Sequence, residues 1–453
     1  MRRLFLICLV LLAVAAVSFG QSAGYGYAGP FPDTTLFKLP PFVVNNGIGV
    51  DPEGKVWITP YLAVAGMDSF LVDTTYFRLG QIYVFNPNGT QASFSPIRIL
   101  TGPDQNNVTV TDTVFRRSST GGNINRSNGN FVGVWANLAY KPGGLIWEIN
   151  YKTGQGVRRI LTDVTSTNIA SVALNQDGEF YICSVLGASP GQILNPDGTL
   201  GTAFASLVPA IGRTIAVSPN GNDVYVPRFT AAPPMTYVYH SDNGSLGPYT
   251  LADSILLGAS VESIAFHPVT GHVWLVADRR SSEFNGKGWS PNTAYAYNPT
   301  TKAVVDSFTV QAWDPGATGP LPRGIAFSPT GDTLYIAHFD VPALPQLVRY
   351  IKGLGVSVER DNDLVPSGYK LSQNFPNPFN PSTRIQFELA SSGMTTLKVY
   401  DLMGREVSTL VDKMMEAGSY TATFDAARLP SGTYVYVLTS GAQRLSGKMM
   451  LLK

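Results

Sequence analysis

Charged and amide side chains recur at matching positions of a repeated pattern in the first 352 residues. Four positions before the last apolar residue of each short strand stand Asn46, Arg213, Glu262 and Arg323. A second group just beyond the following strands comprises Arg228, Asp278, Arg279, His338 and Asp340. Guanidinium groups bind carboxylates and phosphates through paired hydrogen bonds. Together these residues predict a polar ligand site that accepts anions.

Two other interpretations of these residues stay open. In one of them, Glu262 forms an ion pair with Arg213 or Arg323. The pair would neutralise the buried charges, and its role would be structural. In the other, Glu262 is a general base and the two arginines stabilise an oxyanion, as in a lactonase-like hydrolase or a lyase. That chemistry needs a divalent metal held by several carboxylate or amide oxygens. Because arginine takes two of these positions, we predict no metal and no cofactor, and we favour a binding protein while leaving the enzyme question open.

The elements that position these residues come from an internal repeat. Its first part is a strand, a turn with proline and glycine, and a strand that ends in an aromatic residue, in residues 47–57, 171–181, 214–225, 263–274 and 324–335, with a degenerate copy in 114–135. Its second part is another strand with its own turn, in residues 82–89, 147–154, 193–198, 237–244, 295–299 and 347–350. Proline fixes φ and glycine accepts positive φ, so these turns are predicted to be tight.

The repeat predicts an all-β protein with a six-bladed β-propeller. Seven blades are the alternative, because the repeat is weakest between residues 98 and 130. The last blade lacks an outer strand, which we expect residues 34–39 to supply. The phrases GIAFSPTGDTLYIA and TIAVSPNGNDVYV resemble NHL and YVTN propellers. This resemblance implies an architecture that binding proteins, scaffolds, lactonases and lyases share, so activity does not follow from it.

Long insertions are expected to crowd one face of this propeller, in residues 61–80, 227–236, 278–293, 307–323 and 338–346. Loops on a rigid scaffold carry variable chemistry, so we expect an unknown glycan, peptide or protein ligand at this face. Nucleic acid is not an expected partner, because 32 Lys and Arg residues balance 31 Asp and Glu residues without a basic stripe. The four histidines show no metal-binding spacing, and Cys183 follows apolar strand residues as a buried thiol would.

A different pattern fills residues 369–453. It opens on the octet NFPNPFNP, continues with strand-length runs at 384–389, 396–400, 420–424 and 434–438, and predicts a small Ig-like β-sandwich. Four phrases, NFPNPFNPST, LKVYDLMGREVSTLV, AGSYTATFDAARLPSGTYVYVLTS and the final KMMLLK, resemble the A-type C-terminal sorting domain of the type IX secretion system.

This resemblance implies recognition by the outer-membrane export machinery, removal of the domain, and attachment at the cell surface or release. The sorting-signal residues that it implies are Asn374, Phe375, Pro376, Asn377, Pro378, Phe379, Asn380, Pro381, Lys448 and Lys453.

The N-terminus agrees with secretion. Arg2 and Arg3 precede an apolar run over residues 4–17, and small residues follow, which predicts a signal peptide over 1–20 with cleavage before Gln21. No later run reaches the length of a membrane span, so none is expected after the signal is removed. The predicted order is signal peptide 1–20, flexible N-terminus 21–33, propeller 34–352, linker 353–368 and sorting domain 369–453.

Overall fold

The computed structural model describes residues 25–32, 45–60, 69–72, 75–79, 81–116, 120–135, 144–162, 169–184, 189–208, 214–228, 233–278, 289, 292–310, 322–338, 347–352, 358–362, 366–426 and 429–453. The protein is all-β, and the one helical element in these ranges is the 3-10 turn η1 (Gly244–Leu246). No helix in the described part of the chain has the length and apolar character of a membrane span.

Antiparallel four-stranded sheets make up most of the N-terminal region. In order from the inner strand outward they are β10 (Thr120–Ile124), β11 (Phe131–Trp135), β12 (Gly144–Ile149), β13 (Gly156–Thr162); β14 (Ile169–Leu174), β15 (Phe180–Ser184), β16 (Ser189–Leu194), β17 (Leu200–Val208); β18 (Ala216–Val217), β19 (Asp223–Arg228), β20 (Met235–His240), β21 (Thr250–Ile255); β22 (Val261–Phe266), β23 (Val273–Ala277), β24 (Thr293–Asn298), β25 (Ala303–Thr309); and β26 (Pro322–Phe327), β27 (Thr333–His338), β28 (Leu347–Lys352), β1 (Tyr25–Pro30).

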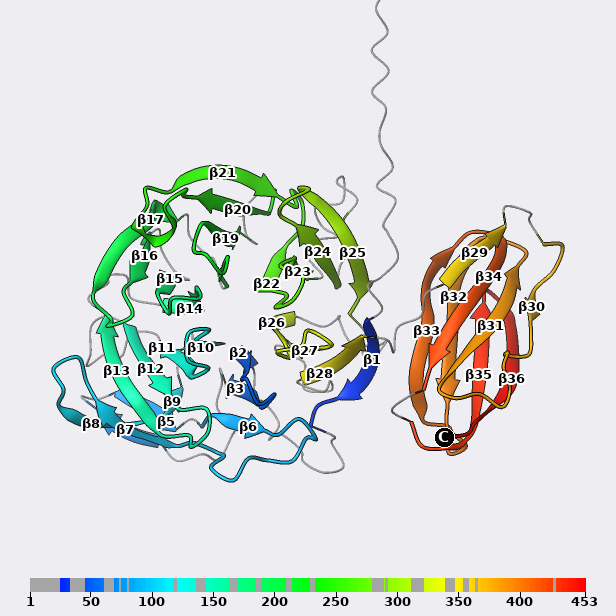
Figure 1. Ribbon diagram of the computed structural model, residues 1–453, viewed down its shortest axis with the longest axis horizontal. Helices are drawn as coiled ribbons and strands as arrows, with labels where there is room; N and C mark the ends of the chain where they lie inside the picture. Colours follow the sequence, from blue (N-terminus) through cyan, green and yellow to red (C-terminus); the bar gives the residue numbers. More distant parts are fainter. Residues whose placement is uncertain are drawn as a thin grey trace, which may run out of the picture.

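These sheets lie around a common centre, together with the three-stranded sheet of β2 (Asn45–Val50), β3 (Val56–Pro60) and β6 (Tyr83–Phe85) (Figure 1). The inner strands β2, β10, β14, β18, β22 and β26 contact one another in that order, and β26 contacts β2 again. Apolar side chains fill the space between neighbouring sheets; Phe85, Ile58 and Tyr335, for example, share one buried cluster. We call residues 25–352 the ring.

The turns between each inner strand and the next strand share one hydrogen-bond pattern and the predicted glycine. The first residue of the turn accepts a hydrogen bond from a backbone N–H farther along the turn, and these residues are Asp51, Asn125, Asn175, Ser218, His267 and Ser328. The glycine of every such turn has positive φ, between 69° and 81°, in Gly54, Gly129, Gly178, Gly221, Gly271 and Gly331. Because a side chain is strained there, the repeated glycine is explained by backbone conformation.

The N-terminus closes the ring, but not with the predicted residues. β1 pairs antiparallel with β28, from Tyr25 opposite Lys352 to Pro30 opposite Val348. The expected closing segment, residues 34–39, lies outside the described residues, and residues 25–30 of the predicted flexible segment form the strand instead. Tyr25 is buried against Trp274, Phe308 and Phe327. Packing of its aromatic ring therefore fixes a glycine-rich segment that local propensity does not favour as a strand.

The weak part of the repeat is an insertion. Residues 98–116 form a hairpin of β7 (Ile99–Pro103) and β8 (Thr109–Thr113), followed by β9 (Phe115–Arg116), which joins β4 (Ser69–Val72) and β5 (Thr75–Leu79). The hairpin lies beside the outer strand β13. Asp112 on the hairpin accepts a hydrogen bond from Trp147 Nε1 at 3.0 Å and pairs with Arg159 at 3.4 Å. The insertion thus covers a sheet edge that would otherwise be exposed.

The C-terminal region is a sandwich of two four-stranded sheets. One has the order β29 (Val358–Asn362), β34 (Gly418–Asp425), β31 (Ser382–Leu389), β30 (Lys370–Leu371), and the other β33 (Glu406–Met415), β32 (Gly393–Tyr400), β35 (Gly432–Ser440), β36 (Gln443–Leu451). Alternate residues of both sheets share one core, which includes Phe387, Leu397 and Tyr436. The predicted linker 353–368 needs correction, because residues 358–362 form the edge strand β29. We call residues 358–453 the sandwich.

Candidate functional site

A β-bulge interrupts the inner strand at several of the predicted site positions. The ladders of β2 with β3, β14 with β15, β22 with β23 and β26 with β27 each skip one residue, and the skipped residues are Asn46, Ala170, Glu262 and Arg323. A bulge redirects the side chain at the extra residue and is common beside functional sites. Asn46, Glu262 and Arg323 therefore occupy equivalent special positions, and alanine takes this place in β14.

Glu262 and Arg323 come together across neighbouring sheets. Arg323 Nε lies 2.8 Å from Glu262 Oε2, and the two side chains are 9% and 0% exposed. The contact is an ion pair by distance, although the Nε–H group is not aligned for a hydrogen bond. A buried charge is stable only when it is compensated. This pairing is the structural alternative that the sequence left open, and it ties β22 to β26.

Two further predicted residues are buried at the ends of the strands that pair with β22 and β26. Asp278 follows β23, and its backbone N–H donates to Ser260 O at 2.9 Å. His338 ends β27, opposite Pro322 and therefore next to Arg323 along the ladder. Burial lowers the pKa of His338 to about 4, so its imidazole is neutral at physiological pH. Its Nδ1 has no hydrogen-bond partner in the described structure, and an unsatisfied buried nitrogen can accept a hydrogen bond from a ligand.

Arg228 is held within its own sheet. It ends β19, its Nη1 donates to Tyr237 Oη at 2.9 Å, and its guanidinium lies 5.3 Å from the centre of the Tyr237 ring. This contact presents the guanidinium in a fixed orientation. Three predicted residues, Arg213, Arg279 and Asp340, lie outside the described residues. No group of three or more His, Cys, Asp or Glu side chains that could hold a metal ion occurs in the described ranges.

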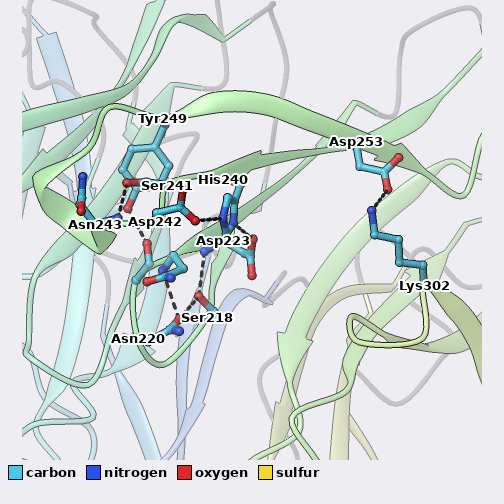
Figure 2. Close-up of polar contacts among 12 residues, drawn as sticks. Ser218, Asn220, Asp223, His240, Ser241, Asp242, Asn243, Tyr249, Asp253 and Lys302 are labelled. Carbon is cyan, nitrogen blue, oxygen red and sulfur yellow. Dashed lines mark hydrogen bonds and ion pairs between the residues drawn. The ribbon is translucent and has the colours of Figure 1, made fainter.

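A second polar cluster, which the sequence did not predict as a site, lies where β19 begins and β20 ends (Figure 2). His240 lies between two carboxylates, with Nδ1 2.7 Å from Asp223 Oδ1 and Nε2 3.1 Å from Asp242 Oδ1. The hydrogen bond to Asp223, and then that to Asp242, raise the pKa of His240. Asp223 and His240 are direct partners in the β19–β20 ladder, so a correct alignment of the two turns would have revealed this contact from sequence.

The histidine of another turn has the opposite protonation preference. His267 Nδ1 accepts from the backbone N–H groups of Val269 and Thr270. Its Nε2 lies 3.1 Å from Gly331 O, which fixes the Nε2–H tautomer. Burial is the largest influence on the pKa of His267 and lowers it. His267 thus has a structural role in its turn. Cys183 is buried as predicted, and burial raises the pKa of its thiol to about 12.

Comparison with known proteins identifies the C-terminal region. Residues 373–452 match the family described as secretion system C-terminal sorting domain. No curated protein matches the chain.

Solved structures resemble it only weakly. A structure described as PorZ, a surface component of the type-IX secretion system of Porphyromonas gingivalis, is 12% identical with a TM-score of 0.38, covering 92% of this chain and 60% of that one. A nidogen/laminin complex chain is 13% identical with a TM-score of 0.37, covering 64% of this chain and 83% of that one. A mitotic checkpoint complex chain is 10% identical with a TM-score of 0.41, covering 70% and 96%. This chain thus spans 60% of the length of the PorZ chain, and none of these likenesses carries an argument about function.

The match to the sorting-domain family, in contrast, does say something about function. A type IX sorting domain is the export signal of the protein that bears it, and it interacts with the type IX machinery. Residues 373–452 therefore form a secretion sorting domain, and the protein is exported across the outer membrane to the cell surface or the extracellular space.

Proposed function

We propose that the protein is a secreted binding protein in which a six-bladed β-propeller holds the ligand site and an Ig-like sorting domain directs export. The cyclic contacts of the inner strands and the sheet closed by β1 support six blades of the NHL or YVTN kind. The insertion at residues 98–116 accounts for the weak stretch of repeat without a further blade. Under this proposal residues 1–20 are the signal peptide, which lies outside the described residues.

The observation that carries the binding role is the ion pair of Glu262 with Arg323. A general base must be available to take a proton, whereas a carboxylate in a buried ion pair holds its charge. The pair favours a preorganised binding surface over the lactonase-like or lyase-like alternative. Next to it, the unsatisfied Nδ1 of His338 offers one hydrogen bond to a ligand, as acceptor or donor according to the tautomer. We infer a glycan, peptide or protein ligand that reaches this side of the ring.

A paired assay tests this proposal on the full chain. Purified protein is applied to an array of neutral and acidic glycans and to a panel of lactones with added Ca²⁺ or Zn²⁺, beside the variants His338→Gln and Arg444→Ala. Binding without turnover, weakened by His338→Gln and unchanged by Arg444→Ala on the sandwich, would support the proposal. Lactone hydrolysis that Glu262→Gln abolishes would replace it with the enzyme alternative.

A further inference from the structure

Two of the six tight turns that follow the inner strands depart from the proline pattern. The second residue of the turn is proline in the other four, at Pro52, Pro219, Pro268 and Pro329. It is Arg126 in the turn after β10 and Gln176 in the turn after β14. Proline restricts the unfolded chain and favours such turns, so an arginine gives up this advantage. The backbone of the turn therefore does not explain Arg126.

Arg126 reaches the opposite side of the ring. Neighbouring turns touch one another, since Pro52 lies against Gly129 and Ser127 lies against Gly178. The guanidinium carbon of Arg126 instead lies 5.8 Å from the centre of the Phe266 ring, at the end of β22. In the cycle of contacts between inner strands, β10 and β22 are three places apart, and they lie across the centre from each other (Figure 1). The side chain of Arg126 therefore crosses the middle of the ring.

The guanidinium group has no counter-ion in this position. None of its N–H groups forms an ion pair or a hydrogen bond within the described part of the chain. Solvent reaches the side chain, yet burial by the surrounding protein lowers the pKa of Arg126, and no neighbouring carboxylate contributes to the shift. The guanidinium stays charged at physiological pH because its ordinary pKa is far higher. In contrast, Arg158, Arg159 and Arg323 each pair with a carboxylate.

An anion would compensate this charge. The contact with Phe266 uses the face of the aromatic ring and requires none of the five N–H donors of Arg126. A guanidinium that has lost part of its hydration gains more from a counter-ion than one in bulk water does. Its planar fork matches the oxygens of a carboxylate or a phosphate. Gln176 is exposed in the adjacent turn and offers an amide N–H group as a further donor.

We propose that Arg126 anchors an anion site in the centre of the ring, which binds the carboxylate or phosphate group of a small molecule. Phe266 holds the guanidinium in place from the opposite sheet. Glu262 lies near the start of β22 and Phe266 at its end, so this site and the Glu262–Arg323 pair lie toward opposite ends of the inner strands. The proposal does not depend on the binding role proposed above.

Titration calorimetry on the full chain at low salt tests the site with inorganic phosphate, citrate and acetate, and with glucose as the uncharged probe. Arg126→Gln removes the charge, whereas Arg126→Lys keeps the charge and loses the paired donors. Lys152→Gln is the matched control, because Lys152 is an exposed cation 5.4 Å from the centre of the Tyr151 ring in the outer turn of the same sheet. Thermal unfolding measures the folding of each variant.

We expect phosphate or citrate to bind the wild type and glucose not to bind. Arg126→Gln should weaken anion binding at least about ten-fold, because it removes hydrogen bonds to a charged group. Arg126→Lys should weaken it less, and Lys152→Gln should leave it unchanged. The relative affinities of phosphate and the carboxylates then identify the group that the site recognises.

Failure of every anion to bind the wild type would overturn the proposal. A lower melting temperature of Arg126→Gln would in that case assign the side chain a structural contact with Phe266 alone. Equal affinities of the wild type and Arg126→Gln would also overturn it, as would an equal loss in Lys152→Gln, because the anions would then bind to surface cations in general. If Arg126→Gln failed to fold, Arg126→Lys would decide in its place.

Discussion

Arg323 and Glu262 join two sheets of the ring through side chains that both stand at β-bulges, 2.8 Å apart and almost completely buried. Because a bulge redirects one side chain without changing the rest of the ladder, two strands can direct opposite charges toward the same point. Loss of one partner leaves the other charge buried without its counter-ion, which is the costly case for ion pairs.

Arg323→Ala is therefore expected to lower the free energy of unfolding by about 3 kcal/mol. The exposed pair of Lys302 Nζ with Asp253 Oδ2, which are 3.5 Å apart, supplies the control (Figure 2). Lys302→Ala should cost less than about 1 kcal/mol because solvent screens that pair. Urea unfolding followed by tryptophan fluorescence measures both. Equal losses in the two variants would contradict a structural role for the buried pair.

The pH dependence of stability should show the raised pKa of His240. A histidine whose folded pKa exceeds its unfolded value stabilises the protein below the unfolded pKa of about 6.5, and this stabilisation is lost as the pH rises through the folded pKa. We expect wild type to melt above His240→Gln at about pH 5.5 and the difference between them to shrink as the pH rises above about 6.5.

His272 provides the control of opposite sign. Burial lowers the pKa of His272 in the folded state. Its effect on the free energy of unfolding is therefore destabilising once the pH falls below the unfolded pKa of about 6.5. A difference between wild type and His240→Gln that grew with rising pH would be inconsistent with the paired carboxylates.

Tyr25 should matter for closure of the ring through both its ring and its hydroxyl. The hydroxyl donates to Gly331 O and lies 3.1 Å from His267 Nε2, and the aromatic ring meets Trp274 edge to face at 5.6 Å. Tyr25→Ala is expected to cost about 3–5 kcal/mol through the cavity it leaves, and Tyr25→Phe about 1 kcal/mol through the lost hydrogen bond. Thermal unfolding measures both, with Tyr369→Phe on the sandwich as control, because the Tyr369 hydroxyl contacts Ser391 Oγ at the surface and not in the interior. A fully stable Tyr25→Ala would mean that β1 does not close the sheet.

Gly447 should tolerate no side chain. A Cβ atom there would lie 2.2 Å from Tyr436 Cζ, and Tyr436 is fully buried. Gly432 begins the neighbouring strand β35, and a Cβ atom added to Gly432 would have no atom within 4 Å. We expect Gly447→Ala to lower stability by about 1–3 kcal/mol through overpacking, with Gly432→Ala close to wild type. Similar unfolding midpoints for the two variants would show that Tyr436 moves aside freely.

Local patterns were sufficient to predict much of this protein. The turns with Asp51 or Ser218 followed by glycine depend on backbone chemistry within five residues, and alternation placed β31 and β34 correctly. The all-β class followed from these signals. Features that depend on contacts between distant parts of the chain could not be predicted in this way. Residues 25–30 contain two glycines, and only contact with Trp274 and Phe327, some 250 or more residues away, makes a strand of them.

The same limit applies to the site. The sequence placed Glu262 and Arg323 at one level of neighbouring strands, because the repeat fixes that register. It could not show the bulges, which leave no composition signal, or choose between Arg213 and Arg323 as the partner of Glu262. It also treated β29 as linker, since the polar run VERDN is a strand only through its pairing with β34.

Closure by β1 sets the order in which the ring can be completed. Tyr25 pairs with Lys352, so a strand synthesised near the beginning of the chain has no partner until almost the whole ring has emerged. Contacts so distant in sequence form late and slowly. Once β28 has been synthesised and until β1 pairs with it, β28 offers an open edge to any strand nearby, including β1 of another molecule. The folding error that this topology favours is therefore exchange of β1 between two molecules. Packing of the buried Tyr25, Tyr27 and Tyr350 at the β1–β28 contact stabilises the correct closure against it.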